Sequence, residues 1–179
     1  MTANKTLTLQ EYAMRFGTLM GIFWILKFIL IPLGFTIPLI QLLFILLTLF
    51  VPILGYLYAR RFRNRYNGGT ITFGRAYIFT FFLYIFASIL TAAAHYIYFR
   101  FIDQGFLFDS YRKQIEEVRQ SVQGDMAAIL DQSMETLNLI ASFTPSEMTL
   151  NLLSNNIFYG MLLALPTALL VMKRKKTNI

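Results

Sequence analysis

The most informative absence in this sequence is cysteine. With none among 179 residues, the chain can form no disulfide, no thiolate metal site and no cysteine nucleophile. It has a single histidine, His95, which excludes a zinc-binding helix with paired histidines, and it contains neither a serine nucleophile elbow nor a glycine-rich phosphate loop. We therefore expect no catalytic residue, no metal and no cofactor, and a protein that is not an enzyme.

Charge is also scarce. Only 14% of the residues are charged, whereas 56% are hydrophobic and 16% are aromatic, and the mean hydropathy is +0.56. A soluble globule of this length needs more polar surface than such a chain can provide. The composition therefore predicts a membrane protein.

Four long apolar runs divide the chain, at residues 12–33, 36–58, 73–101 and 150–172. Each run meets the roughly 20 residues that a helix needs to cross about 30 Å of hydrocarbon. A backbone in lipid must satisfy its own hydrogen bonds, so the runs are expected to be helices. The sequence thus predicts an all-α polytopic protein, a four-transmembrane-helix bundle that forms one membrane domain over residues 1–179.

Basic residues gather in two blocks at the ends of apolar runs. One block follows the second run and the other follows the fourth: Arg60, Arg61, Arg63 and Arg65, and Lys173, Arg174, Lys175 and Lys176. Such blocks remain on the cytoplasmic side, and an even number of spans then puts both termini there. Because the net charge of +7 lies in these blocks and not along a helix face, we expect no nucleic-acid partner.

The connection at residues 103–148 is the one stretch with soluble character, and it is expected to lie outside the cytoplasm. Apolar residues recur there mostly at steps of three and four, at Tyr111, Ile115, Val118, Val122, Met126, Ile129, Met134, Leu137 and Ile140. This spacing predicts an amphipathic helix or a helix pair, with Gly124 as a weak point. Its apolar stripe either packs on the protein's own helices or on the headgroups, or binds a second copy or another envelope protein through residues 109–142.

Polar residues recur at one depth of the predicted spans. Lys27, Gln41, His95, Asn155 and Asn156 all lie within roughly 10 Å of the outer boundary at 1.5 Å per residue. Polar side chains in a span usually face the bundle interior or a water-filled cavity, which predicts an outward-facing polar pocket. In the alternative interpretation, Lys27 snorkels to the surface and the others make ordinary hydrogen bonds between helices.

Small residues also repeat every fourth position on the spans, as at Gly17 and Gly21 or at Gly160, Ala164 and Ala168. Such stripes allow close helix packing, either within one bundle or between two copies. We expect the first, because a four-helix bundle needs these faces in any case.

A family resemblance covers nearly the whole chain. It is carried by the entry to the third span and by its exit, namely Gly69, Ile71, Phe73 and Ala76, then Tyr96, Ile97, Tyr98 and Phe99, followed by Asp103 and Phe106. In this layout the chain resembles a bacterial family of small four-span membrane proteins classed as a domain of unknown function. The resemblance implies a multi-pass protein of the bacterial inner membrane and implies no activity, cofactor or site residue.

Two classes of function remain open. The first is a structural or interaction component of the bacterial envelope, anchored by the bundle and surrounded by membrane lipid. The second is a small transporter, channel or lipid-binding subunit that uses the polar pocket. We favour the first, because four spans leave little room for the repeated halves of a secondary transporter.

Overall fold

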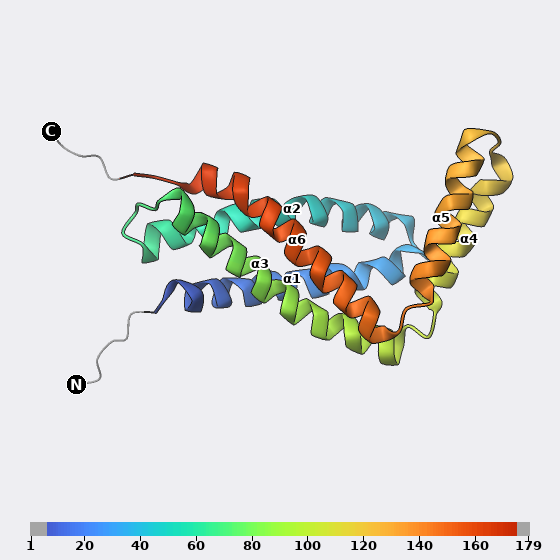
Figure 1. Cartoon of the computed structure of the whole chain (residues 1–179), viewed down its shortest axis with the longest axis horizontal. Helices are drawn as coiled ribbons and strands as arrows, with labels where there is room; N and C mark the ends of the chain where they lie inside the picture. The colour runs from blue at the N-terminus through green and yellow to red at the C-terminus, as the bar shows by residue number, and fades with distance from the viewer. Residues whose placement is uncertain (1–6, 175–179) are drawn as a thin grey trace.

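The structure is a computed structural model that describes residues 7–174, so Lys175 and Lys176 of the second basic block lie outside the described residues. Four long helices run side by side, and a shorter helical hairpin crosses one end of them (Figure 1). The long helices are α1 (Leu9–Gly34), α2 (Pro38–Tyr66), α3 (Phe73–Ile97) and α6 (Pro145–Val171), and a π-helical turn, Tyr98–Ile102, extends α3. All four are long and apolar enough to cross a membrane. The protein is therefore an all-α, multi-pass membrane protein, as the sequence predicts.

Local sequence signals begin and end these helices. A capping box begins α6, where Thr144 Oγ1 accepts the Glu147 N–H at 3.3 Å and the Glu147 carboxylate accepts the Thr144 N–H at 2.8 Å. A similar box, made by Thr8 and Glu11, begins α1. Helix α2 continues eight residues past the predicted end of its apolar run, since arginine is a good helix former outside the membrane as well.

Helix α3 lies at the centre of the bundle and α2 at its edge. Half of the most apolar stretch of α3 is buried, compared with 11% of that of α2. Glycines allow α1 and α6 to approach α3 closely: a Cβ at Gly17 would lie 2.7 Å from the Leu83 carbonyl oxygen, and one at Gly160 would lie 2.6 Å from the Tyr84 Cβ. These small-residue stripes therefore pack within the bundle.

The two basic blocks lie at the same end of the bundle. The backbone of Ile71, just before α3, pairs with that of Lys173, just after α6, through two N–H···O bonds of 2.9 Å. Nearby, the Arg63 guanidinium donates a 2.7 Å hydrogen bond to the carbonyl oxygen of Val171, the last residue of α6. The two connections therefore hold the end of α6 against the loop between α2 and α3.

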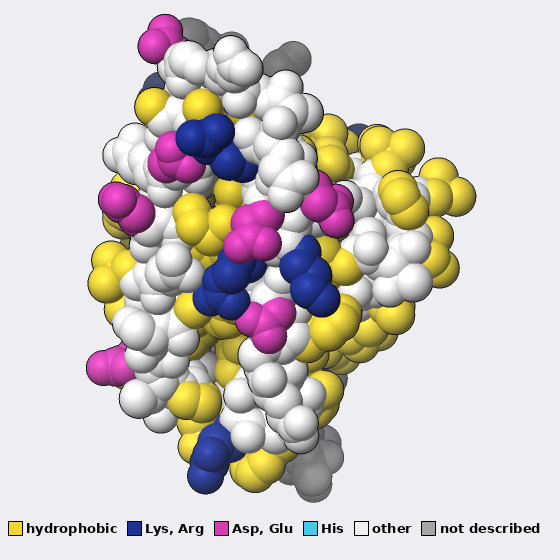
Figure 2. Space-filling view, turned by 90° about the vertical axis from the view of Figure 1, so that its right-hand side faces the viewer, with side chains coloured by type: hydrophobic (Ala, Val, Ile, Leu, Met, Phe, Trp, Pro, Cys, Tyr) yellow, Lys and Arg dark blue, Asp and Glu magenta, His cyan; other side chains and the backbone are white. Residues whose placement is uncertain are grey.

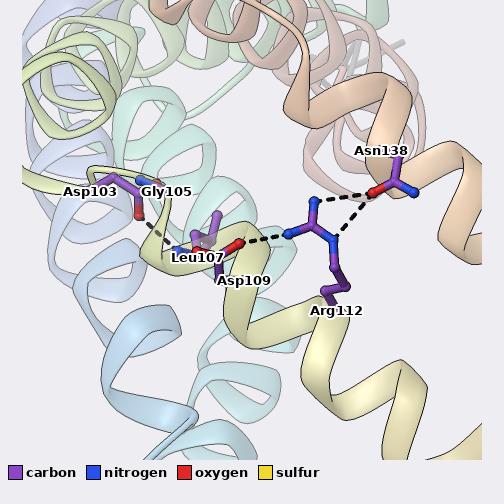
Figure 3. A network of polar contacts seen from close by, with 6 residues as sticks. All are labelled: Asp103, Gly105, Leu107, Asp109, Arg112 and Asn138. Carbon is purple, nitrogen blue, oxygen red and sulfur yellow. Dashed lines mark hydrogen bonds and ion pairs between the residues drawn. The ribbon is translucent and has the colours of Figure 1, made fainter.

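At the other end, the predicted amphipathic segment is a helix pair, α4 (Phe106–Ser121) and α5 (Asp125–Ala141). The chain turns at Gly124, whose φ of +64° favours glycine. Two polar contacts join the helices: Arg119 binds Asp131 at 2.8 Å and 3.1 Å, and Arg112 joins Asp109 to Asn138 (Figure 3). The hydrogen bonds from Arg119 lower the pKa of the Asp131 carboxyl.

The root of the hairpin is tied by the Asp103 carboxylate, which accepts the N–H groups of Gly105 and Leu107 (Figure 3). The ring of Phe35, in the turn between α1 and α2, packs against the rings of Phe106 and Tyr111 at 6.2 Å and 4.7 Å. Charged side chains of both signs cover the face of the hairpin that points away from the bundle (Figure 2). The hairpin therefore forms a polar cap over this end of the spans.

Candidate functional site

A cavity of about 480 Å³ lies inside the bundle, in the half near the α1–α2 turn. All four spanning helices contribute to its walls, which are formed by Trp24, Lys27, Phe28, Ile31, Phe44, Thr48, Leu49, Val51, Pro52, Tyr84, Thr91, His95, Leu152, Asn156, Tyr159, Gly160 and Leu163. The volume lies within the roughly 300–1,000 Å³ that is typical of small-molecule sites. Most of the lining is apolar, with a few polar groups among it, which is the usual composition of such a site.

In the half of the molecule that holds the cavity, α2 diverges from α3 (Figure 1). Pro52 lies inside α2 and faces the cavity, and a proline in a helix interior removes one backbone hydrogen bond. On the opposite wall, Gly160 of α6 brings that helix against Tyr84, which directs the tyrosine ring toward α1 and α2. Close packing on one side of α3 is thus combined with open space on the other.

Lys27 points into this space and does not snorkel to the end of α1. Its ammonium donates a 3.1 Å hydrogen bond to Thr48 Oγ1 on α2 and lies 5.0 Å from the centre of the Phe44 ring. The Thr48 hydroxyl in turn donates to the Phe44 carbonyl oxygen at 2.8 Å. Among residues 7–174 no carboxylate lies within ion-pair distance of Lys27, so its charge is available to an anionic group in the cavity.

Three residues that line the cavity each carry a buried polar atom with no hydrogen-bond partner among the described residues: Trp24 Nε1, Tyr84 Oη and His95 Nδ1. The Trp24 and Tyr84 rings stack at 6.0 Å, and the His95 ring lies 4.4 Å from that of Phe28. Buried polar groups in proteins nearly always have a partner, and an unpaired one costs about 1–3 kcal/mol. The side chains that carry these three atoms all line one cavity.

The structure brings together three of the five residues predicted to form a polar pocket. Lys27, His95 and Asn156 line the cavity. Gln41 is exposed and lies against Gly34 at the α1–α2 turn, and the Asn155 amide donates to Asn151 Oδ1 at 3.0 Å on the exposed face of α6. Depth alone does not decide which way a residue faces, because adjacent residues of a helix point about 100° apart.

Sequence reasoning missed Trp24, Tyr84 and Thr48 as parts of this site. The two aromatic residues are expected in any apolar span, although each carries one polar group that needs a partner when buried. The sequence feature that relates to Tyr84 is the presence of small residues on two other spans, because Gly55 and Gly160 both lie against its side chain. That signal depends on the pairing of helices far apart in the sequence.

Comparison with known proteins gives one match. Residues 15–173 match the model of a family described as a protein of unknown function (DUF4199). No curated protein matches the chain, and no solved structure does. The match includes most of α1 and the whole of α2 to α6, which confirms the resemblance to a family of small membrane proteins classed as a domain of unknown function. With its four apolar helices and their internal cavity, this chain belongs to the DUF4199 family.

Proposed function

We propose that this protein binds an amphiphilic, lipid-like molecule in the cavity between its four spans. The supporting observation is the group of three polar atoms, unpartnered among the described residues, on Trp24, Tyr84 and His95, which line a mostly apolar cavity. The apolar part of the ligand would lie along the walls of α2 and α6. Its polar part would accept hydrogen bonds from the Trp24 indole and the Lys27 ammonium. This is a binding role without catalysis.

The route into the site supports a ligand that comes from the membrane. Two lining residues are largely exposed, Leu49 on α2 by 65% and Tyr159 on α6 by 59%. The cavity therefore reaches the lipid-facing surface of the bundle between these helices. At 1.5 Å per residue, Lys27 lies about 10 Å from the end of α1, and Trp24 lies about 15 Å from it. These depths match one leaflet of a bilayer whose hydrocarbon core is about 30 Å thick.

The experiment compares two neighbouring asparagines. The protein is extracted in a mild detergent, and the molecules that co-purify are identified and quantified by mass spectrometry. Asn156→Ala changes the cavity wall, whereas Asn155→Ala changes the exposed face of the same helix and is the matched control. We expect Asn156→Ala and Lys27→Met to retain less of one amphiphile than the wild type does, and Asn155→Ala to retain as much. Equal retention in all variants, or no stoichiometric ligand in the wild type, would contradict the proposal.

The proposal includes a location, the inner membrane of a bacterium, with both termini and both basic blocks in the cytoplasm. It is supported by the position of Arg63 and Lys173 at one end of the bundle, since basic blocks stay on the cytoplasmic side. A cysteine introduced at Ser121 should react with an impermeant reagent added outside the cell, and one introduced at Asn64 should not. The opposite labelling pattern would reverse the orientation.

A second role, interaction with a partner, is favoured by the surface of the hairpin. Val118, Met126, Ile129 and Leu139 are each half or more exposed, although the segment is amphipathic. A second copy of this chain or another envelope protein could cover them, and the bundle would then serve as an anchor. Replacing Val118, Ile129 and Leu139 by serine should reduce crosslinked dimers or the recovery of a partner without loss of membrane insertion. Unchanged crosslinking and recovery would remove this role.

A further inference from the structure

Two hollows lie at the end of the bundle opposite the cavity, one on the surface of α2 and the other between α1 and α2. One, of about 350 Å³, is lined by Leu57, Arg60, Arg61, Asn64 and Arg65. The other, of about 170 Å³, is lined by Tyr12, Arg15, Phe16, Leu19, Arg61 and Tyr66. Arg61 lines both hollows, and we call the two together the arginine cleft.

No ion pair within the described part of the chain neutralises the positive charge of the arginine cleft. Within residues 7–174 no carboxylate lies within ion-pair distance of Arg15, Arg60, Arg61 or Arg65. Arg63, on the same turn of α2, differs from these four because its guanidinium donates to the Val171 carbonyl and to Asn64 Oδ1. The structure thus uses one arginine to hold α6 and leaves the guanidinium groups of the cleft free for an anion.

Apolar side chains lie below these charges on both helices. Leu19 follows Arg15 by four residues on α1, which runs into the membrane, and Leu57 precedes Arg61 by four residues on α2, which runs out of it. On each helix the Cα atom of the arginine therefore lies about 6 Å nearer the membrane boundary than that of the leucine. The rings of Tyr12 and Tyr66 pack at 4.2 Å beside the charges, where amphipathic aromatic residues are usual.

This surface, with charges at one level and apolar side chains below them, is complementary to a phospholipid with its charged headgroup and apolar chains. We propose that the arginine cleft binds the phosphate headgroup of an anionic phospholipid from the leaflet at this end of the bundle. Arg15 and Arg61 bind the phosphate oxygens from the two helices, and the acyl chains lie along Leu19 and Leu57. Guanidinium groups fit this task because their planar donors can bind phosphate in a bidentate manner. Basic pockets between spans on the cytoplasmic side are known places for such headgroups.

The test uses the purified full chain and native mass spectrometry with phosphatidylglycerol and phosphatidylcholine at equal concentration. Arg61→Gln removes the guanidinium shared by both hollows. Arg75→Gln removes a positive charge at the same end, on α3, that lines neither hollow, and it is the matched control. We expect the wild type and Arg75→Gln to prefer phosphatidylglycerol, and Arg61→Gln to lose about tenfold of that preference. Arg61→Lys should retain only part of the preference for phosphatidylglycerol, since lysine keeps the charge but lacks the planar guanidinium donors that bind phosphate in a bidentate manner.

Other results would overturn the proposal. Equal retention of the two lipids by the wild type would show that the cleft has no headgroup preference. An equal loss in Arg75→Gln would assign the effect to total charge and not to the cleft. If inorganic phosphate displaces phosphatidylglycerol, and the lipid does not bind again when the phosphate is diluted, the ligand is a soluble anion and not a lipid. If Arg61→Gln fails to fold, as judged from its Tm, Arg15→Gln takes its place with the same expected result.

Discussion

Replacing Tyr84 by phenylalanine would test a single atom of the cavity wall. The Tyr84 side chain is fully buried at the centre of the bundle, and its hydroxyl has no hydrogen-bond partner among the described residues. The ring remains in Tyr84→Phe, with its stacking on Trp24 at 6.0 Å and its contact with Gly160. The substitution therefore removes the hydroxyl and changes little else.

The sign of the effect depends on whether the cavity is occupied. An unpaired buried hydroxyl costs about 1–3 kcal/mol, and a void the size of a methyl group costs about 1 kcal/mol. Tyr84→Phe should therefore stabilise the ligand-free protein by about 0–2 kcal/mol. In the occupied protein it removes a hydrogen bond to the ligand, worth about 0.5–1.5 kcal/mol, which corresponds to an affinity about 2- to 12-fold lower.

The assay measures both effects in one preparation. Thermal unfolding is recorded for delipidated protein and after the amphiphile eluted from the wild type is added back. We expect Tyr84→Phe to have the higher Tm without the amphiphile and the smaller rise in Tm with it. Tyr96→Phe, on the exposed side of α3 and outside the cavity, is the control and should behave as the wild type does. A lower Tm without the amphiphile, together with an unchanged rise, would show that the hydroxyl stabilises the fold and does not bind a ligand.

Two further predictions concern the scaffold. Gly160→Ala should destabilise the bundle by about 1–3 kcal/mol in thermal unfolding because its Cβ would lie 2.6 Å from that of Tyr84, whereas Gly74→Ala, with no atom near the new Cβ, should be neutral or stabilising by up to about 1 kcal/mol. Equal effects of the two substitutions would contradict the packing of α6 on α3. The pKa of Asp131 is lowered by its bond to Arg119, so this pair stabilises the hairpin above the ordinary carboxyl pKa of 3.8 and stops doing so as the pH falls below it. The protection factor of the α5 amides, corrected for the intrinsic exchange rate at each pH, should fall below that pH in the wild type and be insensitive to that change in Asp131→Asn; the same fall in both would refute this role.

The elements of the fold could be predicted from the sequence because their signals are local. Run length and hydropathy indicate four spans, since a helix must be about 20 residues long to cross the hydrocarbon core. The capping box of Thr144 and Glu147 indicates where α6 begins. The spacing of apolar residues by three and four between Tyr111 and Ile140 indicates a helical connection. Each of these signals depends on residues within one or two helical turns of one another.

The candidate site depended on tertiary structure. Depth along each span can be counted in residues, and three of the residues that it groups, Lys27, His95 and Asn156, line the cavity. The rotation of each helix about its axis cannot be counted in that way, because it follows from how the helices pack on α3. That packing turns Asn156 toward the cavity and Asn155 away from it.

The same packing creates the features that sequence position does not show. Gly160 allows α6 to pack on Tyr84, and within residues 7–174 the hydroxyl of Tyr84 and the indole N–H of Trp24 have no partner, in side chains that line the same cavity as Lys27. An unpaired polar atom is a property of its surroundings and not of its residue type. Length and hydropathy thus determined that this chain spans the membrane four times, and only the contacts between distant helices decided where it has room for a ligand.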